Sequence, residues 1–277
     1  MKRLLLVDFN NLLYRAFNVH DSLHFAGKST GGVYGFINQL STLLSKYPTP
    51  HVIVCSDSPP YLRSKDYPDY KLRRARQKDP DREKAIAQNR QFALDFLELM
   101  SIDYWEEKGL EADDLIAIAC KKYHKEFDQV IVASNDDDLY QLFKFGNVYF
   151  KSKKGNKESG LYGFEEFKKE YPDLSLEDWL RILTMAGTHN DLPGIRGIGE
   201  VTAFKIIREG TYRKTYRKHK KTIDLFSKLI RLPYHDDVEV PPAYAFGFNE
   251  RKLMKFLAGK GIEYSGHMKK AFSIFNS

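Results

Sequence analysis

The sequence predicts an α/β protein with a central, mostly parallel sheet and a helical C-terminal region. Over the first 150 residues, short apolar runs typical of buried strands alternate with amphipathic helical patterns. From about residue 163 onward the pattern is mostly helical. Acidic residues stand at or just beyond several apolar runs, at the edge where parallel α/β sheets carry their sites. We place a boundary near residue 170, between regions 1–170 and 171–277.

The elements of the first region follow from apolar runs and from the residues that interrupt them. Residues 3–8 form the first strand, and a helix starts after it at Asn10 or Asn11. A second helix begins after Gly31 and ends before Pro48, because proline breaks helices. Further strands are expected over 51–55, 101–105, 129–134 and 147–150, and further helices over 91–100 and 111–124.

Composition excludes several classes of protein. Hydrophobic residues make up 42% of the 277 residues, which is enough for a folded core. No apolar run approaches the roughly 18 residues of a membrane span, and the N-terminal apolar run is too short for an export signal. The two cysteines, Cys55 and Cys120, cannot form a disulfide framework. We therefore expect an intracellular protein without a membrane anchor.

The net charge of +7 is concentrated in two short segments. Residues 63–78 hold seven Lys or Arg against two Asp, and residues 208–221 hold seven against one Glu, so the rest of the chain is net acidic. This pattern favours a polyanionic partner held at two places. Two solvated helix faces are the alternative interpretation.

Seven acidic residues are expected at one edge of the sheet. Four lie at or after strand ends, and three start the helix over 111–124. Helix capping and the helix dipole are the alternative explanation for those at helix starts. So many carboxylates repel one another unless cations lie among them, and Mg²⁺ or Mn²⁺ prefers such oxygen ligands. The residues are Asp8, Asp57, Glu111, Asp113, Asp114, Asp136 and Asp138.

Divalent cations beside basic segments favour phosphodiester hydrolysis. Two cations about 4 Å apart can activate water and stabilise the leaving oxygen. Such a site needs basic side chains at the scissile phosphate, and Lys71 and Arg74 would lie one turn apart in a helix. Ordinary solvated charge is the alternative for both residues.

A glycine-rich hairpin between two helical patterns marks the second region. Gly194, Gly197 and Gly199 fall between helical patterns over 176–186 and 200–208. Glycine lets main-chain N–H groups approach phosphates, and a helix N-terminus adds positive potential. A tight turn with glycine caps is the alternative. We favour contact with a nucleic-acid backbone, which reads no base sequence.

Taken in chain order, these motifs resemble the 5′-nuclease family of phage 5′ exonucleases, flap endonucleases and the N-terminal nuclease domain of bacterial DNA polymerase I. The resemblance covers nearly the whole chain. It implies a PIN-like nuclease domain followed by a helix–hairpin–helix (three-helix) region. The matching segments are Leu6-Val-Asp8 with Asn10-Asn11-Leu12, Asp57 with Arg63, Tyr67-Pro-Asp-Tyr-Lys71-Leu-Arg-Arg74, Leu110-Glu-Ala-Asp-Asp-Leu115, Ser134-Asn-Asp-Asp-Asp-Leu139 and Leu192-Pro-Gly-Ile-Arg-Gly-Ile-Gly199.

The resemblance also implies roles for the individual residues. Lys71 and Arg74 would contact the scissile phosphate, and residues 60–90 would form a helical arch around the free 5′ end. A K⁺ ion would be shared between the hairpin and a DNA phosphate. The first metal would be surrounded by Asp8, Asp57, Glu111, Asp113 and Asp114, and the second held by Asp136 and Asp138. DNA contacts would come from Arg63, Tyr67, Tyr70, Gly194, Gly197, Gly199 and Lys205, with Tyr67 and Tyr70 stacking on an unpaired base.

One loop departs from the family's pattern. Family members carry two further aspartates just before the hairpin, where this chain reads Ala186-Gly-Thr-His-Asn-Asp191. The second metal site is therefore short of ligands. We expect weaker binding there, supported through water by His189 or Asp191.

The leading hypothesis is a metal-dependent, structure-specific 5′ nuclease that acts on DNA flaps, gaps or 5′ ends. We expect a monomer in a bacterial or phage-infected cell. A catalytically weakened DNA-junction binding protein is one alternative, because the loop before the hairpin has lost acids. An RNase H-like nuclease that removes RNA primers from hybrids is the other. The retained acids, together with Lys71 and Arg74, favour an enzyme over a binding protein.

Overall fold

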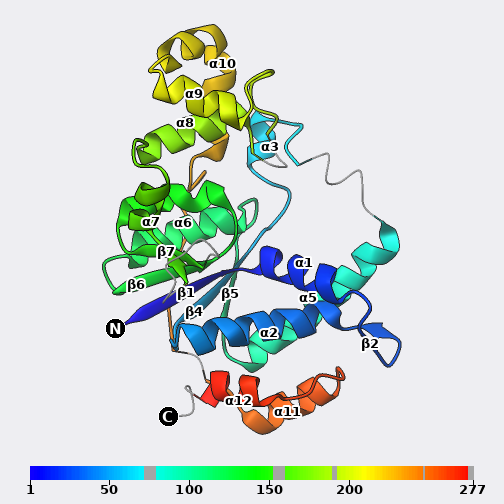
Figure 1. Ribbon diagram of the computed structural model, residues 1–277. Coiled ribbons are helices and arrows are strands. Elements are labelled where there is room, and N and C mark those ends of the chain that lie inside the picture. Colours follow the sequence, from blue (N-terminus) through cyan, green and yellow to red (C-terminus); the bar gives the residue numbers. More distant parts are fainter. Residues whose placement is uncertain (72–78, 152–159, 189–191, 246, 274–277) are drawn as a thin grey trace.

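The centre of the computed structural model is a six-stranded sheet with the strand order β5-β4-β1-β6-β7-β8 (Figure 1). All neighbouring pairs are parallel except β7 and β8. The mostly parallel sheet expected from the sequence is therefore confirmed. Its strands are β1 (Arg3–Asp8), β4 (Val52–Ser56), β5 (Asp103–Glu106), β6 (Gln129–Ala133), β7 (Val148–Lys151) and β8 (Leu161–Tyr162), and a separate hairpin consists of β2 (His24–Phe25) and β3 (Lys28–Ser29).

The structure describes residues 1–71, 79–151, 160–188, 192–245 and 247–273. None of the helices in these ranges is long and apolar enough to cross a membrane. The helices are α1 (Phe9–His20), α2 (Gly31–Lys46), α3 (Arg63–Asp66), α5 (Pro80–Leu99), α6 (Ala112–Tyr123), α7 (Phe164–Glu170), α8 (Leu176–Ala186), α9 (Glu200–Arg208), α10 (Tyr212–Ile230), α11 (Glu250–Ala258) and α12 (Gly266–Ser273), with the 3₁₀ helix η1 (Asp137–Phe145).

Strand β1 shows how helices cover both faces of the sheet. Its residues Leu4 to Val7 are fully buried, as expected of a central parallel strand. Leu4 and Leu6 belong to a core cluster with α6, η1 and α7. Leu5 and Val7 point to the other face and pack with α1, α2 and α5. The alternation along one strand thus divides the core into two layers.

The helices of the second region, residues 171–277, lie at two ends of the molecule (Figure 1). Helices α8, α9 and α10 stand at one end of the molecule, whereas α11 and α12 lie at the opposite end (Figure 1). Leu253, Leu257 and Phe272 of α11 and α12 are buried in the same cluster as α2 and α5. The C-terminal helices therefore complete the core of the first region.

The helix before β5 is longer than its apolar pattern predicted. Helix α5 begins at Pro80, well before the expected start at residue 91. Asp79 caps it by accepting a hydrogen bond from the N–H of Asp81 (3.0 Å). Asp followed by Pro is a helix-start signal that we missed, because the first turns of α5 have little apolar pattern. Part of the expected arch, residues 72–78, lies outside the described residues.

Candidate active site

Three neighbouring strands bring acidic side chains to one edge of the sheet. Strands β4, β1 and β6 are adjacent and parallel, so their carboxyl ends meet. Asp8 ends β1, Asp57 follows β4, and Asp136 lies shortly beyond β6. Helix α6 begins at the same edge, with Glu111 as its N-cap and Asp113 in its first turn. We call these five residues the acidic edge; Asp138 lies next to it in the first turn of η1.

Asp8 is held in a fixed position at the centre of the acidic edge. Its carboxylate accepts hydrogen bonds from the N–H of Asn11 (2.9 Å) and the hydroxyl of Ser134 (3.0 Å). The first of these bonds caps α1, which explains why the helix begins directly after the strand. Burial, together with the charges of Asp57 and Asp136, raises the pKa of Asp8 from 3.8 to about 7.

Asp113 shows the same crowding of negative charge. Burial raises the pKa of its carboxyl well above the usual value, and the charges of Asp136, Asp8 and Glu111 raise it further. These residues come from three separate segments of the chain. Their mutual repulsion shows that the fold brings the acids predicted from the sequence close enough to interact.

The raised pKa of Asp8 gives a testable dependence of stability on pH. The pKa of Asp8 is higher in the folded state than its unfolded value of 3.8. The contribution of Asp8 to the free energy of unfolding is therefore complete below about pH 4, and it disappears as the pH rises through about 7. We expect wild-type protein in EDTA to lose up to roughly 4 kcal/mol of unfolding free energy from this group across that window. Asp8→Asn should remove this part of the decline. Urea denaturation at several pH values tests it, and identical declines for both proteins would contradict it.

Lys71 supplies positive charge at the acidic edge. Its Nζ lies 3.2 Å from Glu111 Oε1 and 3.7 Å from Asp57 Oδ2. The rings of Tyr61 and Tyr70 flank the ammonium group, with centroids at 4.6 and 5.7 Å. Burial alone would lower the pKa of Lys71, but the charges of Glu111 and Asp57 raise it well above the usual value. Lys71 therefore stays protonated beside the carboxylates.

Lys71 does not lie in a helix, which corrects the expectation of a helical pair with Arg74. Its φ of 55° is in the left-handed region, which interrupts any right-handed helix there. The ion pairs with Asp57 and Glu111 accompany this conformation. Three other predicted residues, Arg74, His189 and Asp191, lie outside the described residues.

Arg63 and Asp114 are used for structure, contrary to the predicted DNA and metal contacts. Arg63 is 2% exposed, so its guanidinium cannot reach DNA at the surface. Both of its terminal nitrogens bind the carboxylate of Asp114, which also accepts hydrogen bonds from the N–H groups of Glu111 and Tyr234. With four donors already bound and no exposed surface, the Asp114 carboxylate has no free position for a metal.

Of the two tyrosines predicted to stack on a base, Tyr70 is buried and Tyr67 is half-buried. Tyr70 is buried, and its hydroxyl donates to Glu111 Oε2 (3.1 Å). The ring of Tyr67 packs edge-on against Phe226 of α10, with 5.8 Å between centroids. Stacking on an unpaired base does not fit Tyr70. Both rings instead fix the segment before Lys71 against α10.

The donor atoms allow a test of whether a divalent cation fits here. The acidic edge offers only carboxylate oxygens, which hard cations prefer. Glu111 Oε1 is buried and accepts no hydrogen bond, although it faces Lys71. As the side chains stand, no group of three or more Asp, Glu, His or Cys residues in the described ranges is arranged as a metal site. The carboxylate oxygens are therefore suitable ligands for a divalent cation. In this structure Lys71 provides the positive charge that balances them.

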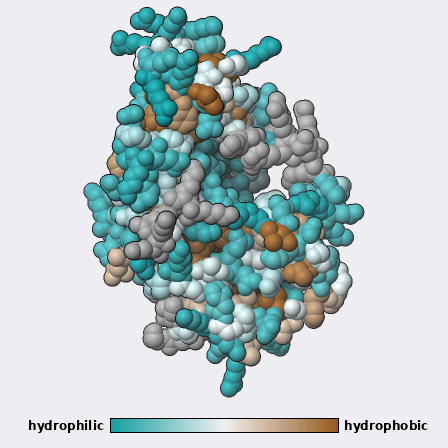
Figure 2. Space-filling model, in the orientation of Figure 1, coloured by the Kyte–Doolittle hydropathy of each residue, from teal (hydrophilic) through white to brown (hydrophobic). Residues whose placement is uncertain are grey.

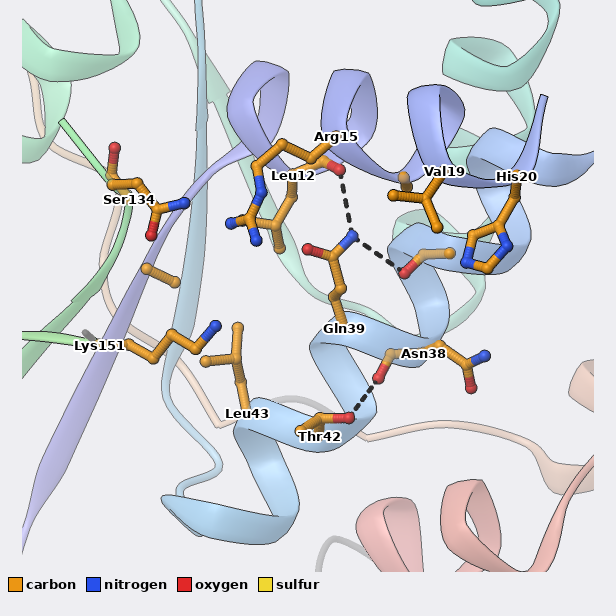
Figure 3. A pocket seen from close by; sticks show the side chains of 14 residues that line it. Leu12, Arg15, Val19, His20, Asn38, Gln39, Thr42, Leu43, Ser134 and Lys151 are labelled. Carbon is orange, nitrogen blue, oxygen red and sulfur yellow. Dashed lines mark hydrogen bonds between the residues drawn. The ribbon is translucent and has the colours of Figure 1, made fainter. Parts of the chain in front are cut away.

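A cavity of about 450 Å³ adjoins the acidic edge between α1 and α2 (Figure 3). It extends to Ser134, which binds Asp8. The guanidinium of Arg15 lies on the side nearer Ser134, and Lys151 points in from β7 (Figure 3). Gln39 is fixed below Arg15 by its bonds to main-chain oxygens of α1 and α2. The sequence did not single out Arg15, which lies about two turns after Asp8 on α1.

The three hairpin glycines differ in the space around them: Gly194 lies against the main chain, whereas Gly197 and Gly199 do not. Gly194 has a φ of 68°, and a Cβ there would lie 2.4 Å from the main chain of Ala186. Gly197 and Gly199 have nothing within 4 Å of an added Cβ. Gly199 is the N-cap of α9, and Lys205 extends from the last turn of that helix. Two of the three predicted glycines are thus exposed, with open space beside their Cα atoms.

This difference predicts opposite outcomes for two alanine substitutions. Gly194→Ala should lower the free energy of unfolding by about 3 kcal/mol, because alanine would have a strained φ there and its Cβ would clash with the main chain. Gly199→Ala, at a φ of −84° and in open space, should change the unfolding free energy by less than about 1 kcal/mol. Thermal or urea denaturation measures both. Equal effects would show that Gly194 does not serve main-chain packing.

The topology and the acidic edge together define a PIN-like 5′-nuclease fold. The T5 5′-exonuclease with bound zinc superimposes with a TM-score of 0.70 over 99% of both chains, at 18% identity. Flap endonuclease-1 from Methanococcus jannaschii gives a TM-score of 0.62, covering 99% of this chain and 93% of that chain at 18% identity. The fold expected from the sequence is confirmed.

A family model for the 5′-3′ exonuclease N-terminal, resolvase-like domain matches residues 3–172. The chain therefore belongs to the 5′-3′ exonuclease family. DNA polymerase I of Bacillus subtilis is 32% identical over 211 residues, covering 75% of this chain. The 5′-3′ exonuclease of Aquifex aeolicus is 28% identical over 258 residues, covering 87% of this chain and 85% of that protein. The chain spans about a quarter of the length of the DNA polymerase I relatives.

Proposed function

We propose that the protein is a divalent-metal-dependent, structure-specific 5′ nuclease that hydrolyses phosphodiesters near DNA 5′ ends and flaps. One observation carries the proposal. Acidic side chains from separate segments meet, together with Lys71, at the carboxyl edge of a parallel sheet. Such a concentration of charge is unfavourable for folding and is characteristic of sites that bind cations.

Known relatives and fold neighbours support this proposal. The curated relative from Aquifex aeolicus is itself a 5′-3′ exonuclease. The T5 D15 flap endonuclease has been solved in a complex with DNA and metal ions, and the catalytic core of Rad2 with a DNA substrate. For this chain we propose Mg²⁺ or Mn²⁺ as the cation, with a second, weaker site at Asp136 and Asp138.

Each group at the acidic edge has a proposed part in the reaction. Asp8, Asp57, Glu111 and Asp113 would hold the cation, which supplies an activated water and neutralises charge on the phosphate. Lys71 would exchange its carboxylate partners for the scissile phosphate as the cation neutralises them. Asp114 does not bind the cation in this proposal, because Arg63 and two main-chain N–H groups already satisfy it.

The DNA would be held on both sides of the acidic edge. Gly197 and Gly199 would bind a duplex phosphate through main-chain N–H groups. A K⁺ ion would be shared between the hairpin and the same phosphate. The basic stretch 208–221 covers the first half of α10, and Figure 2 shows that end of the molecule covered by hydrophilic side chains. Arg15 would contact the strand that leaves the acidic edge along the cavity. A monomer is sufficient for this arrangement.

A substrate panel tests the proposal. End-labelled 5′-flap DNA, blunt duplex, single-stranded DNA and the same flap with an RNA 5′ strand are each incubated with Mg²⁺. We expect the flap DNA to be cut fastest and Arg15→Gln to weaken its binding several-fold. Faster cleavage of the RNA strand would identify the primer-removing nuclease instead. Tight binding of all substrates without cleavage would identify a DNA-junction binding protein.

A further inference from the structure

Two buried polar side chains hold the end of α10 against the acidic edge. The segment that they bind is 229–234, which runs from the last turn of α10 into the following loop and which we call the joint. Arg63 is 2% exposed and Gln141 is 6% exposed. Both bind main-chain atoms of the joint, Arg63 from α3 and Gln141 from η1.

Arg63 connects the joint to the start of α6. Its Nε donates to the carbonyl of Leu229 (2.8 Å), while its terminal nitrogens bind the Asp114 carboxylate. Asp114 also accepts directly from the N–H of Tyr234 (2.8 Å). The Nη1 atom of Arg63 lies 3.7 Å from Glu111 Oε2. Asp114, in the first turn of α6, is therefore bonded to both ends of the joint, directly to Tyr234 and through Arg63 to Leu229.

Gln141 makes the equivalent connection to η1. Its Nε2 donates to the carbonyl of Ile230 (3.1 Å), and its Oε1 accepts from the N–H of Leu232 (2.8 Å). The same Nε2 also donates to the carbonyl of Asp138 (2.8 Å). Because η1 begins directly after Asp136, the main chain beside Asp136 is bonded to the same joint through Gln141 and Asp138.

The joint is also continuous with the helices proposed to hold DNA. Leu229 and Ile230 are buried in a cluster with Leu180 of α8 and Leu192 at the start of the hairpin. Helix α10 kinks at His219, and its half beyond the kink, away from the joint, carries most of the second basic stretch. A displacement of the joint would therefore shift the hairpin and α10 relative to the acids.

We propose that Arg63 and Gln141 are positioning residues that determine which phosphodiester is cut. They fix the distance between helices α8–α10 and the acidic edge, so that a duplex held by the helices presents one phosphate to the acids. The inference rests on the proposed nuclease function. A displacement on the order of 1 Å can lower the rate at the correct phosphate about 10²-fold, which lets neighbouring phosphates compete.

Two conservative substitutions loosen the joint without removing buried volume. Arg63→Lys keeps a positive charge for Asp114, but a lysine cannot bind a carboxylate with two nitrogens and also reach the Leu229 carbonyl. Gln141→Met keeps a similar size and loses the bonds to Ile230 and Leu232. Arg3→Lys is the matched control, because the Nε of Arg3 binds Gln129 Oε1 (2.9 Å) at the opposite end of β1.

The test is single-turnover cleavage of a labelled 5′ flap with a fixed branch point, with products resolved to single nucleotides. Wild type and Arg3→Lys should give one dominant product, and duplex affinity in EDTA should stay within about twofold for all four proteins. In Arg63→Lys and Gln141→Met, the ratio of the dominant product to its neighbours should fall about tenfold.

Other outcomes overturn the inference. A variant that melts cooperatively but shows a slower rate at an unchanged cleavage position would assign Arg63 or Gln141 a merely structural role. Gln141→Met decides the question if Arg63→Lys does not fold. Wild-type protein that binds the flap but cuts nothing in Mg²⁺ or Mn²⁺ would overturn the proposed function as well, which distinguishes the two failures.

Discussion

Asp8→Asn is expected to lower the rate of 5′-flap cleavage by roughly 10³-fold or more. Asp8 lies where β1 ends between β4 and β6, and its charge interacts with Asp57, Asp113 and Asp136. Asparagine keeps an oxygen to cap α1 at Asn11 but removes the negative charge that a cation needs. Binding of flap DNA in EDTA should therefore remain within about twofold of wild type.

The matched control for Asp8→Asn is Asp128→Asn. Asp128 is exposed and accepts a hydrogen bond from the N–H of Lys2, at the opposite end of the sheet. Its substitution should leave cleavage unchanged. Single-turnover kinetics at saturating protein separate binding from the chemical step. A rate for Asp8→Asn within about tenfold of wild type would show that the reaction does not take place at the acidic edge.

Lys71→Ala is expected to lower the cleavage rate by roughly 10²-fold, because it removes a positive charge that lies beside the carboxylates of Glu111 and Asp57. The ammonium lies 3.2 Å from Glu111 and 3.7 Å from Asp57, and it is largely buried. A scissile phosphate in the same place would lose its cationic partner. Lys71→Arg should recover part of the rate, since arginine keeps the charge but needs more space between Tyr61 and Tyr70.

Lys125→Ala is the control for Lys71→Ala. Lys125 is exposed beyond the C-terminal end of α6, away from Glu111 at the N-terminal end. Its substitution should change neither rate nor binding. If Lys71→Ala instead reduces affinity for DNA in proportion to the cleavage rate, Lys71 only binds the strand. Lys71 would then have no part in the chemical step, although it lies among the carboxylates.

The acidic edge could be predicted because it depends on local patterns. A buried strand that ends in an acid needs no knowledge of distant residues, and parallel strands bring such ends together. Asp8, Asp57 and Asp136 were placed in this way, as were Glu111 and Asp113 from a helix start. The glycines of the hairpin were also recognisable, although the separate role of Gly194 became visible only from its close approach to Ala186.

Other features depend on contacts between residues far apart in sequence. Arg63 and Asp114 both carry charge in motifs that favour binding, and only the fold shows that each neutralises the other beside Leu229 and Tyr234. The left-handed conformation of Lys71 likewise accompanies tertiary ion pairs rather than a helical sequence pattern. Helices α11 and α12 have ordinary amphipathic patterns, which say nothing about which apolar surface they cover.

The most direct test of the account is single-turnover cleavage of a 5′-flap DNA by the wild-type protein in Mg²⁺, in Mn²⁺ and in EDTA. The same acids should bind the cation and govern the reaction, so cleavage near the branch should occur with either ion and stop in EDTA while the DNA remains bound. Cleavage that continues in EDTA at an undiminished rate would contradict hydrolysis at a carboxylate-bound cation. Bound but uncut flap DNA in both ions would contradict the nuclease function itself.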